Sequence, residues 1–446
     1  MRNGGRLSAA IEVLSDFERR RVPLKIALAD WARGARFAGA KDRAWVSGLC
    51  LDVLRRRRSL AAAMNDDSPR AAAFGGLRWL WGYSADDLEA LAAEAPHGPG
   101  NLTDTELTML GKATPDSAAA VSVDRAGVEG DFPDWLAPHI SRAFGDETVT
   151  ELLALAERAD VDLRINTLKT DPEKGFGALK AVGAQPAGIL ATAARIPAPP
   201  PSEKTSDVTI IPAFSKGWVE VQDLGSQIAA AAAGDIAGKQ VLDYCAGGGG
   251  KSLALAAMMR NRGQLYAFDA DPRRLKPIYE RASRAGVRNL QIVNPLTDME
   301  ALSALKGRID VVLVDAPCTG SGVWRRHPDS KWRLTPEQLA TRMQEQDATL
   351  GEASAFVKPG GRLVYVTCSI FMEENEDRTS EFLRANADFT ATSALSGIEA
   401  SGLATSEGLA ALGGGGSGAA LRLTPARHRT DGFYIATFRR AGAMAR

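Results

Sequence analysis

Residues 310–332 read DVVLVDAPCTGSGVWRRHPDSKW, and this stretch decides the fold of the largest part of the chain. The apolar, mostly β-branched run Ile309–Val314 is typical of a strand buried on both faces in a parallel sheet. The strand is expected to stop before Pro317, because proline cannot donate to the ladder of a sheet. The Asp315 carboxylate and the Cys318 thiol are then left at the carboxyl end of the strand, the edge where ligands bind in open α/β sheets.

The second part of the stretch is a glycine loop followed by positive charge. Thr319–Gly322 loosens the backbone, and four cations follow it among two tryptophans. Cations interleaved with aromatic rings suit phosphates and stacked bases, so we predict RNA contact by Arg325, Arg326, Lys331 and Arg333. Each component alone is more often a helix cap, a packed thiol or a solvated face, but their order is much more specific than the parts.

Strands and helices alternate on both sides of this stretch. The predicted strands are Val241–Cys245, Gln264–Asp269, Leu290–Val293, Ile309–Val314 and Arg362–Thr367. Such alternation favours a right-handed, doubly wound, mostly parallel sheet. Ala420–Leu423 and Gly432–Phe438 are predicted as late strands that close the sheet, and Gly413–Gly418 as a flexible connection between them and the preceding chain.

A glycine-rich turn follows the first of these strands. Ala246–Gly250 leads through Lys251 into a helix, so a ligand can approach the backbone and meet the free amides of a helix N-terminus. The spacing is not that of a P-loop, which would require a glycine at Cys245, and the dinucleotide pattern lacks its usual context. An acid, Asp269, stands 26 positions beyond Asp243, about the distance at which a carboxylate binds ribose hydroxyls. The turn and the acid together predict an adenosine cofactor.

A second thiol, Cys368, follows the strand Arg362–Thr367. Glu373–Glu376 comes next and is expected to open a helix. If this strand is the neighbour of Ile309–Val314, Cys318 and Cys368 face the same crevice. A thiolate nucleophile requires a lowered pKa, which helix N-termini and nearby cations can supply.

Length and composition limit the class of protein. A chain of 446 residues is too long for one ordinary core, so two or three domains are expected. The 45% apolar and 24% charged content is that of a soluble globular protein. The four cysteines show no metal-ligand spacing, and no secretory signal or membrane-length apolar run is present. We therefore expect no disulfide scaffold, no metal, no membrane span and a cytoplasmic location.

The first part of the chain is predicted to be an all-α domain over residues 1–95. Residues 1–60 carry 14 Lys and Arg against 6 Asp and Glu, whereas residues 61–160 carry 6 against 18. This asymmetry indicates a nucleic-acid face on the basic part. The densest cluster, Arg55–Arg58, fits a solvated helix end and RNA contact equally well.

A linker and a small module are predicted before the large sheet. Residues 96–132 are acidic and weakly periodic, which is typical of a linker. Residues 133–225 are predicted to form a small α+β module, and residues 226–446 the domain of the large sheet. The strand candidates of the module are Val161–Asn166, Thr209–Pro212 and Gly217–Val221, with a helix over Asp171–Val182.

Taken together, these motifs resemble the RNA cytosine-5 methyltransferases of the RsmB/Sun type. The resemblance covers about 133–440 and is carried by the residues Asp243–Ala246, Gly249–Lys251, Asp315–Cys318, Arg325–Asp329, Lys331–Trp332, Thr367–Ser369 and Glu373–Asn375, with flanking signatures at Leu163–Lys169, Gly217–Asp223 and Asp431–Phe433. It implies a Rossmann-like class I methyltransferase domain, an RRM-like middle module and a NusB-like, RNA-binding helical domain.

The resemblance also implies the roles of single residues. Cys368 would add to C6 of the target cytosine, Asp315 would hydrogen-bond the ring at N3, and Cys318 would assist release of the product. The implied substrate is RNA, 16S ribosomal RNA in particular, and the implied protein is a monomer. S-adenosylmethionine would be held by Cys245, Ala246, Gly247, Gly248, Gly249, Gly250, Lys251, Asp269 and Asp315.

Two positions depart from the family pattern. Gly248 stands where the family usually has a proline, so we expect altered rigidity of the turn rather than lost binding. The acid that the family places after the third strand is replaced by a segment in which Asn294 or Asp298 takes its role.

Other functions fit parts of the sequence. Transfer RNA is an alternative substrate. DNA cytosine-5 methylation would use Cys318 as the nucleophile and would leave Cys368 unexplained. A non-catalytic RNA-binding assembly factor would leave both thiols, Asp315 and Lys251 without a role. Binding of S-adenosylmethionine followed by a methyl-transfer assay separates the enzyme from the assembly factor.

Overall fold

The computed structural model divides the chain into two compact units. It describes residues 1–112, 130–201, 203, 207–413 and 419–442, so the loop predicted over Gly413–Gly418 lies almost entirely outside the described residues. The helical unit comprises Met1–Arg158, Pro199–Thr205 and Val323–Thr335. The sheet unit comprises Ala159–Ala198, Ser206–Gly322 and Pro336–Arg446.

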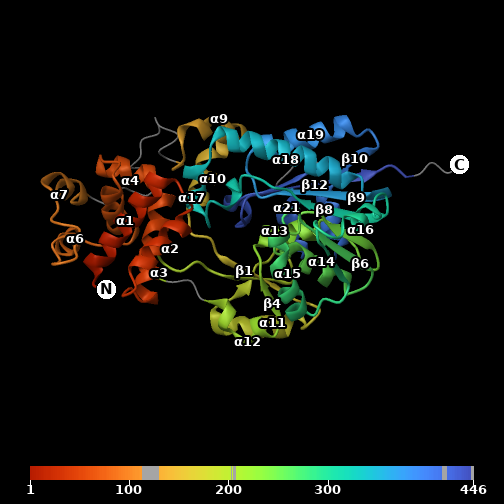
Figure 1. Ribbon diagram of the computed structural model, residues 1–446, viewed down its shortest axis with the longest axis horizontal. Coiled ribbons are helices and arrows are strands. Elements are labelled where there is room, and N and C mark those ends of the chain that lie inside the picture. Colours follow the sequence, from red (N-terminus) through yellow and green to blue (C-terminus); the bar gives the residue numbers. More distant parts are fainter. Residues whose placement is uncertain (113–129, 202, 204–206, 414–418, 443–446) are drawn as a thin grey trace. The chain divides into compact units, whose positions relative to one another are not determined.

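An eight-stranded sheet organises the sheet unit (Figure 1). Its order is β10-β12-β9-β8-β5-β6-β7, with β11 paired to β12. The bounds are β5 (Gln240–Asp243), β6 (Gln264–Phe268), β7 (Leu290–Val293), β8 (Ile309–Asp315), β9 (Val357–Thr367), β10 (Phe389–Thr392), β11 (Leu421–Leu423) and β12 (Phe433–Arg440). The strands from β9 to β7 are mutually parallel, and β12 is antiparallel to its three neighbours. The predicted mostly parallel sheet is confirmed.

Helices cover both faces of this sheet, as Figure 1 shows. They are α13 (Leu224–Ala231) and α14 (Gly250–Met259) on one face, and α18 (Pro336–Ser354) and α19 (Glu376–Ala385) on the other. Side chains of a strand alternate between faces, so Val311 and Leu313 pack with the first pair of helices and Val312 and Val314 with the second. This burial on both faces explains the unbroken apolar run of β8.

A smaller antiparallel sheet of order β2-β3-β1-β4 also belongs to the sheet unit. Its strands are β1 (Val161–Ile165), β2 (Gln185–Pro186), β3 (Ala193–Ile196) and β4 (Val219–Val221), and α11 (Pro172–Leu179) packs on it. The prediction of a strand over Thr209–Pro212 is wrong. Asp207 caps a 3-10 turn by accepting the Thr209 amide, and Pro212 starts the short helix α12 (Pro212–Ser215), because its fixed φ suits a first helical position.

The helical unit has an apolar core over its first seven helices, which includes Leu14, Leu49 and Phe74. Its helices are α1 (Asn3–Arg20), α2 (Leu24–Gly34), α3 (Ala40–Arg55), α4 (Arg57–Met64), α5 (Pro69–Gly75), α6 (Ala85–Ala92), α7 (Asp104–Leu110), α9 (Ala137–Phe144), α10 (Thr148–Leu155) and α17 (Pro328–Arg333).

The bounds of the units differ from the predicted domains. The described part of the predicted linker 96–132 contains α7, whose Leu110 is buried in the helical core and whose Glu106 pairs with Arg70 at 2.7 Å. Helices α9 and α10, expected in the small module, also belong to the helical unit. Packing of short amphipathic helices overrides the acidic composition on which the linker prediction rested.

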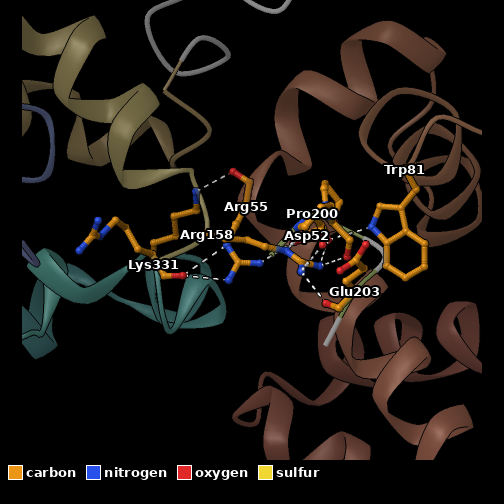
Figure 2. A network of polar contacts seen from close by, with 9 residues as sticks. Asp52, Arg55, Trp81, Arg158, Pro200, Glu203 and Lys331 are labelled. Carbon is orange, nitrogen blue, oxygen red and sulfur yellow. Dashed lines mark hydrogen bonds and ion pairs between the residues drawn. The ribbon is translucent and has the colours of Figure 1, made fainter. Parts of the chain in front are cut away.

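The segment Val323–Thr335 belongs to the helical unit although it is continuous with β8 of the sheet unit. Figure 2 shows the network that holds it there. Arg55 on α3 donates to the Arg325 carbonyl at 2.8 Å, and the Lys331 ammonium donates to the Arg55 carbonyl at 3.1 Å. Asp52 accepts hydrogen bonds from Arg55, Arg158 and Trp81, at 2.7, 2.6 and 2.8 Å.

Among the described residues, no helix combines the length and the apolar content that a membrane crossing requires. The same residues contain no group of three or more His, Cys, Asp or Glu side chains placed to hold a metal ion.

Candidate active site

The two thiols predicted at strand ends lie side by side. Strands β8 and β9 are parallel neighbours, with Asp315 paired to Val366 at their carboxyl ends. The Sγ atoms of Cys318 and Cys368, which follow these strands, are 3.3 Å apart and half-buried. The two strands are neighbours, as the expectation required, and the two sulfurs lie next to each other at their ends.

Two glycines allow the loops around the thiols to meet. The Gly322 amide donates to the Cys368 carbonyl at 2.9 Å, and the Gly432 amide donates to the Gly322 carbonyl at 2.8 Å. A Cβ on Gly322 would lie 2.1 Å from the Gly432 carbonyl oxygen, which no side chain tolerates. Glycine is therefore required at position 322 of the stretch, and the Asp431–Phe433 signature has a structural role at the thiol loops.

An ion pair stands beside the thiols. Lys251 on α14 donates to the Asp315 carboxylate at 2.7 Å, and its ammonium lies 5.4 Å from the centre of the Phe433 ring. Burial, the largest single influence, lowers the pKa of Lys251, but the charge and hydrogen bond of Asp315 together with other negative neighbours, including Asp243, outweigh it, and the net pKa is raised. The lysine therefore stays cationic beside the Asp315 carboxylate.

The Cys318 thiol is held in its protonated form. The pKa of Cys318 lies well above its usual range, first because of its hydrogen bond with Cys368 and then because of burial and the charge of Glu374. The Cys318 thiol therefore keeps its proton at neutral pH.

The predicted cofactor turn has the backbone that its glycines suggest. Gly247 and Gly249 have φ of 51° and 82°, and a Cβ on Gly249 would lie 2.8 Å from Ile278. The Asp269 carboxylate accepts the Gly247 amide at 2.9 Å and pairs with Arg274 at 3.0 Å. Asp269 therefore shapes the turn in addition to any contact with a ribose.

An arginine supports the turn where the family has proline. Arg281 donates to the Gly248 carbonyl at 2.5 Å and to Glu220 on β4 at 3.1 Å. The small sheet thus reaches the turn through Glu220 and Arg281. This contact replaces, by a side chain, some of the rigidity that a proline would give at position 248.

Asp243 is a site residue that the sequence analysis did not single out for a role. It ends β5, is fully buried, and accepts from the Ser252 hydroxyl at 2.6 Å through Oδ2. Its Oδ1 is buried without a hydrogen-bond partner in the structure. Burial, followed by the charge of Asp315, raises its pKa to about 7. An unsatisfied carboxylate oxygen beside a glycine turn fits a cationic ligand, so the residues present suit the predicted cofactor.

The remaining predicted cofactor residues line the same end of the sheet. Cys245 and Ala246 follow β5, and burial raises the pKa of the Cys245 thiol, which leaves it protonated. Asp298 is engaged by the Asn294 amide at 3.0 Å and by the Thr297 hydroxyl at 2.9 Å. Asn294 closes this turn at the end of β7, and lines a cavity of about 270 Å³ with residues of α15 (Pro272–Ala285).

The four predicted RNA-binding residues belong to the helical unit. Lys331 is buried, and burial lowers its pKa to about 7. Arg325 is buried too, whereas Arg326 and Arg333 are half-exposed. Arg333 pairs with Asp329 at 3.2 Å and, with Trp332, Arg57 and Arg58, lines an open groove of about 910 Å³. RNA contact by these residues stays a prediction, and the half-exposed pair is better placed for it.

Comparisons with known proteins agree with the motifs. The family model for 16S rRNA methyltransferase RsmB/F matches residues 235–439. The chain is 32% identical to ribosomal RNA small subunit methyltransferase B of Xylella fastidiosa over 78% of its length and 81% of that protein. It is 28% identical to the protein of the same name from Xanthomonas campestris, over 90% of each. A solved methyltransferase homolog from Pyrococcus horikoshii, 27% identical, matches 71% of this chain and 97% of its own with a TM-score of 0.56.

Proposed function

This chain belongs to the RsmB/Sun type of RNA methyltransferases, and from that membership we propose that it methylates C5 of a cytosine in small-subunit ribosomal RNA. The observation that carries the proposal is the thiol pair, with its Sγ atoms 3.3 Å apart, beside the Lys251–Asp315 ion pair. Either thiol alone fits ordinary packing. Two thiols at the ends of neighbouring strands support covalent chemistry on one base.

We propose S-adenosylmethionine as the cofactor. Bound at this site, it would supply an electrophilic methyl group. Gly247–Gly250 would lie against it, Asp269 would bind its ribose, and Asp243 would balance its positive charge. Asn294, at the end of β7, is the better candidate for the adenine side, because Asp298 is already engaged by the Asn294 amide and the Thr297 hydroxyl.

Cys368 is the proposed nucleophile. Its thiolate forms a bond to C6 of the cytosine, and the C5–C6 electron pair moves so that C5 becomes nucleophilic. Asp315 hydrogen-bonds N3 and holds the ring in its protonated form as the adduct develops. The target base must be extruded from any stack to reach these side chains.

Cys318 is proposed to assist release. The hydrogen bond and the charge of Cys368, which raise the pKa of Cys318, both disappear when Cys368 is bound to C6. Cys318 can then lose its proton to solvent and accept the C5 proton. The C5–H electrons restore the C5–C6 double bond, the bond from C6 to sulfur breaks, and its electron pair returns to Cys368.

The helical unit and the small sheet would hold the RNA. We propose that the helical unit is NusB-like and binds RNA, with Arg326 and Arg333 among its contacts, and that β1–β4 with α11 form an RRM-like module. The basic N-terminal segment supports this assignment. We also propose that the protein is a monomer and acts in the cytoplasm.

Bisulfite sequencing of total RNA from cells with and without this protein tests the function. We expect one cytosine of small-subunit ribosomal RNA to lose its protection from conversion when the gene is deleted. Loss of protection in transfer RNA alone would move the substrate there. Unchanged patterns together with no methyl transfer in vitro would favour a non-catalytic assembly role.

A further inference from the structure

Glu374 is the most completely bonded buried carboxylate near the thiols. It lies in the 3-10 turn Met372–Glu374 after β9 and is fully buried. Oε1 accepts from the Thr319 amide and from the Gln346 side chain, both at 2.9 Å. Oε2 accepts from the Thr319 hydroxyl at 2.6 Å and from the Ser369 hydroxyl. Four donors converge on one charged group.

These donors come from the residues next to the thiols. Thr319 directly follows Cys318, and Ser369 directly follows Cys368. Gln346 donates through the same nitrogen to the carbonyl of Pro317, which precedes Cys318, at 2.9 Å. The Glu374 carboxylate is thus bonded to the two loops that follow β8 and β9, at the positions where those loops carry sulfur.

We propose that Glu374 is the positioning residue that holds the Cys318 and Cys368 loops at the separation the reaction requires. This inference rests on the proposed function. Glu374 contacts neither sulfur, so it acts through Thr319 and Ser369. A charged acceptor gives shorter and stronger hydrogen bonds than a neutral one, which suits a clamp on two loops. Burial raises the pKa of Glu374 while its four donors oppose that rise.

Glutamine should replace this clamp in part, whereas alanine should not. In Glu374→Gln the amide oxygen can accept from the Thr319 amide and from Gln346, and the amide nitrogen can donate to the two hydroxyls, which rotate to accept. Glu374→Ala removes the acceptor of four hydrogen bonds and opens space beside the two loops. Comparing the two variants therefore separates the effect of the hydrogen bonds of Glu374 from the effect of its charge.

Phenylarsine oxide measures the thiol pair without RNA or cofactor. It reacts with two adjacent thiols to form two arsenic–sulfur bonds, and its oxygen leaves as water with the two thiol protons. We expect the full-length protein to bind one equivalent of phenylarsine oxide tightly. The Cys318→Ala variant, which has only one of the two thiols, should lose this binding. Glu374→Ala should weaken binding at least about tenfold and Glu374→Gln by less than about threefold, since one lost buried hydrogen bond corresponds to roughly a tenfold change. Glu381→Ala, an exposed carboxylate on α19, serves as the matched control.

Methyl transfer to RNA is measured on the same variants. The expected pattern is a lower kcat with little change in KM for S-adenosylmethionine in Glu374→Ala, and recovery in Glu374→Gln. If Glu374→Ala does not melt cooperatively, Thr319→Val combined with Ser369→Ala removes both hydroxyl donors instead. The positioning role would be overturned if a folded variant, either Glu374→Ala or the Thr319→Val and Ser369→Ala double variant, bound phenylarsine oxide as tightly as the parent. A protein that loses arsenical binding in Glu374→Ala but never methylates RNA would keep that role and refute the proposed function.

Discussion

At the scale of single residues, Asp243 couples the site to pH. Its pKa is raised to about 7, from an ordinary value of 3.8, by burial and by neighbouring carboxylates. A carboxyl whose folded pKa is raised stabilises the fold below its unfolded pKa, and that contribution is lost as the pH rises towards 7. A cationic ligand favours the ionised carboxylate, so binding should release a proton.

The affinity for S-adenosylmethionine should therefore rise between pH 5.5 and pH 7.5 and then level off. Asp243→Asn should bind more weakly at pH 7.5 and lose most of this pH dependence. Calorimetric titrations at three pH values check this, with Asp298→Asn as the control, since hydrogen bonds hold the pKa of that carboxyl below its usual range. Equal pH slopes in the parent and Asp243→Asn would assign the dependence to another group.

At the scale of elements, two arginines of helix α15 share the partner Glu220, but only one of them also reaches the cofactor turn. Arg281 and Arg284 both pair with Glu220, but only Arg281 also donates to the Gly248 carbonyl of the cofactor turn. Arg281→Ala should weaken cofactor binding about tenfold, or about 1.4 kcal/mol, because one charge-assisted hydrogen bond is lost. Arg284→Ala, the matched control, should change it little. Equal losses of affinity, by calorimetry, would mean that Glu220 matters and the turn contact does not.

Helix α17 makes its unit sensitive to pH. Burial lowers the pKa of Lys331 from 10.5 to about 7, so between these values the unfolded chain binds the extra proton. Stability from this group is therefore reduced below pH 7 and recovers as the pH rises towards 10. The parent should gain stability relative to Lys331→Met when the pH is raised from 7 to 9. The expected gain in its free energy of unfolding, relative to that variant, is about 1–2 kcal/mol.

Urea unfolding at the two pH values measures this shift. A difference that does not change with pH would mean that Lys331 stays charged inside the helical unit. In that case the negative charge of Asp131, which favours the ammonium, compensates for the burial of Lys331 and for the repulsion from Arg55 and Arg56.

Strand pattern and motif order predicted the centre of the sheet unit well. The strand β7 was predicted with its observed bounds, and the ends of β8 and β9 put the thiols where the spacing indicated. The strands β3, with the sequence AARI, and β10, with the sequence FTAT, were not predicted, because neither contains a run of large apolar residues. Lys331 is buried against α3, which lies more than 270 positions away in the sequence. The composition around Lys331 therefore could not predict its burial.

At the scale of the whole molecule, the proposed reaction requires RNA, cofactor and both thiols together. One of the places where the chain passes between the two units is Gly322 to Val323, directly after the loop of Cys318. The helical unit is proposed to bind RNA and the sheet unit to modify it. The central test therefore uses the full-length protein.

That measurement is the trapping of a covalent complex between protein and RNA. The parent and the variants Cys318→Ala, Cys368→Ser and the double mutant are incubated with substrate RNA and S-adenosylmethionine and run on a denaturing gel. The account predicts a complex that accumulates in Cys318→Ala, contains transferred methyl, and is missing from Cys368→Ser and from the double mutant. Complexes in Cys368→Ser alone would make Cys318 the nucleophile, and methylation retained without complexes in both single mutants would contradict thiol catalysis.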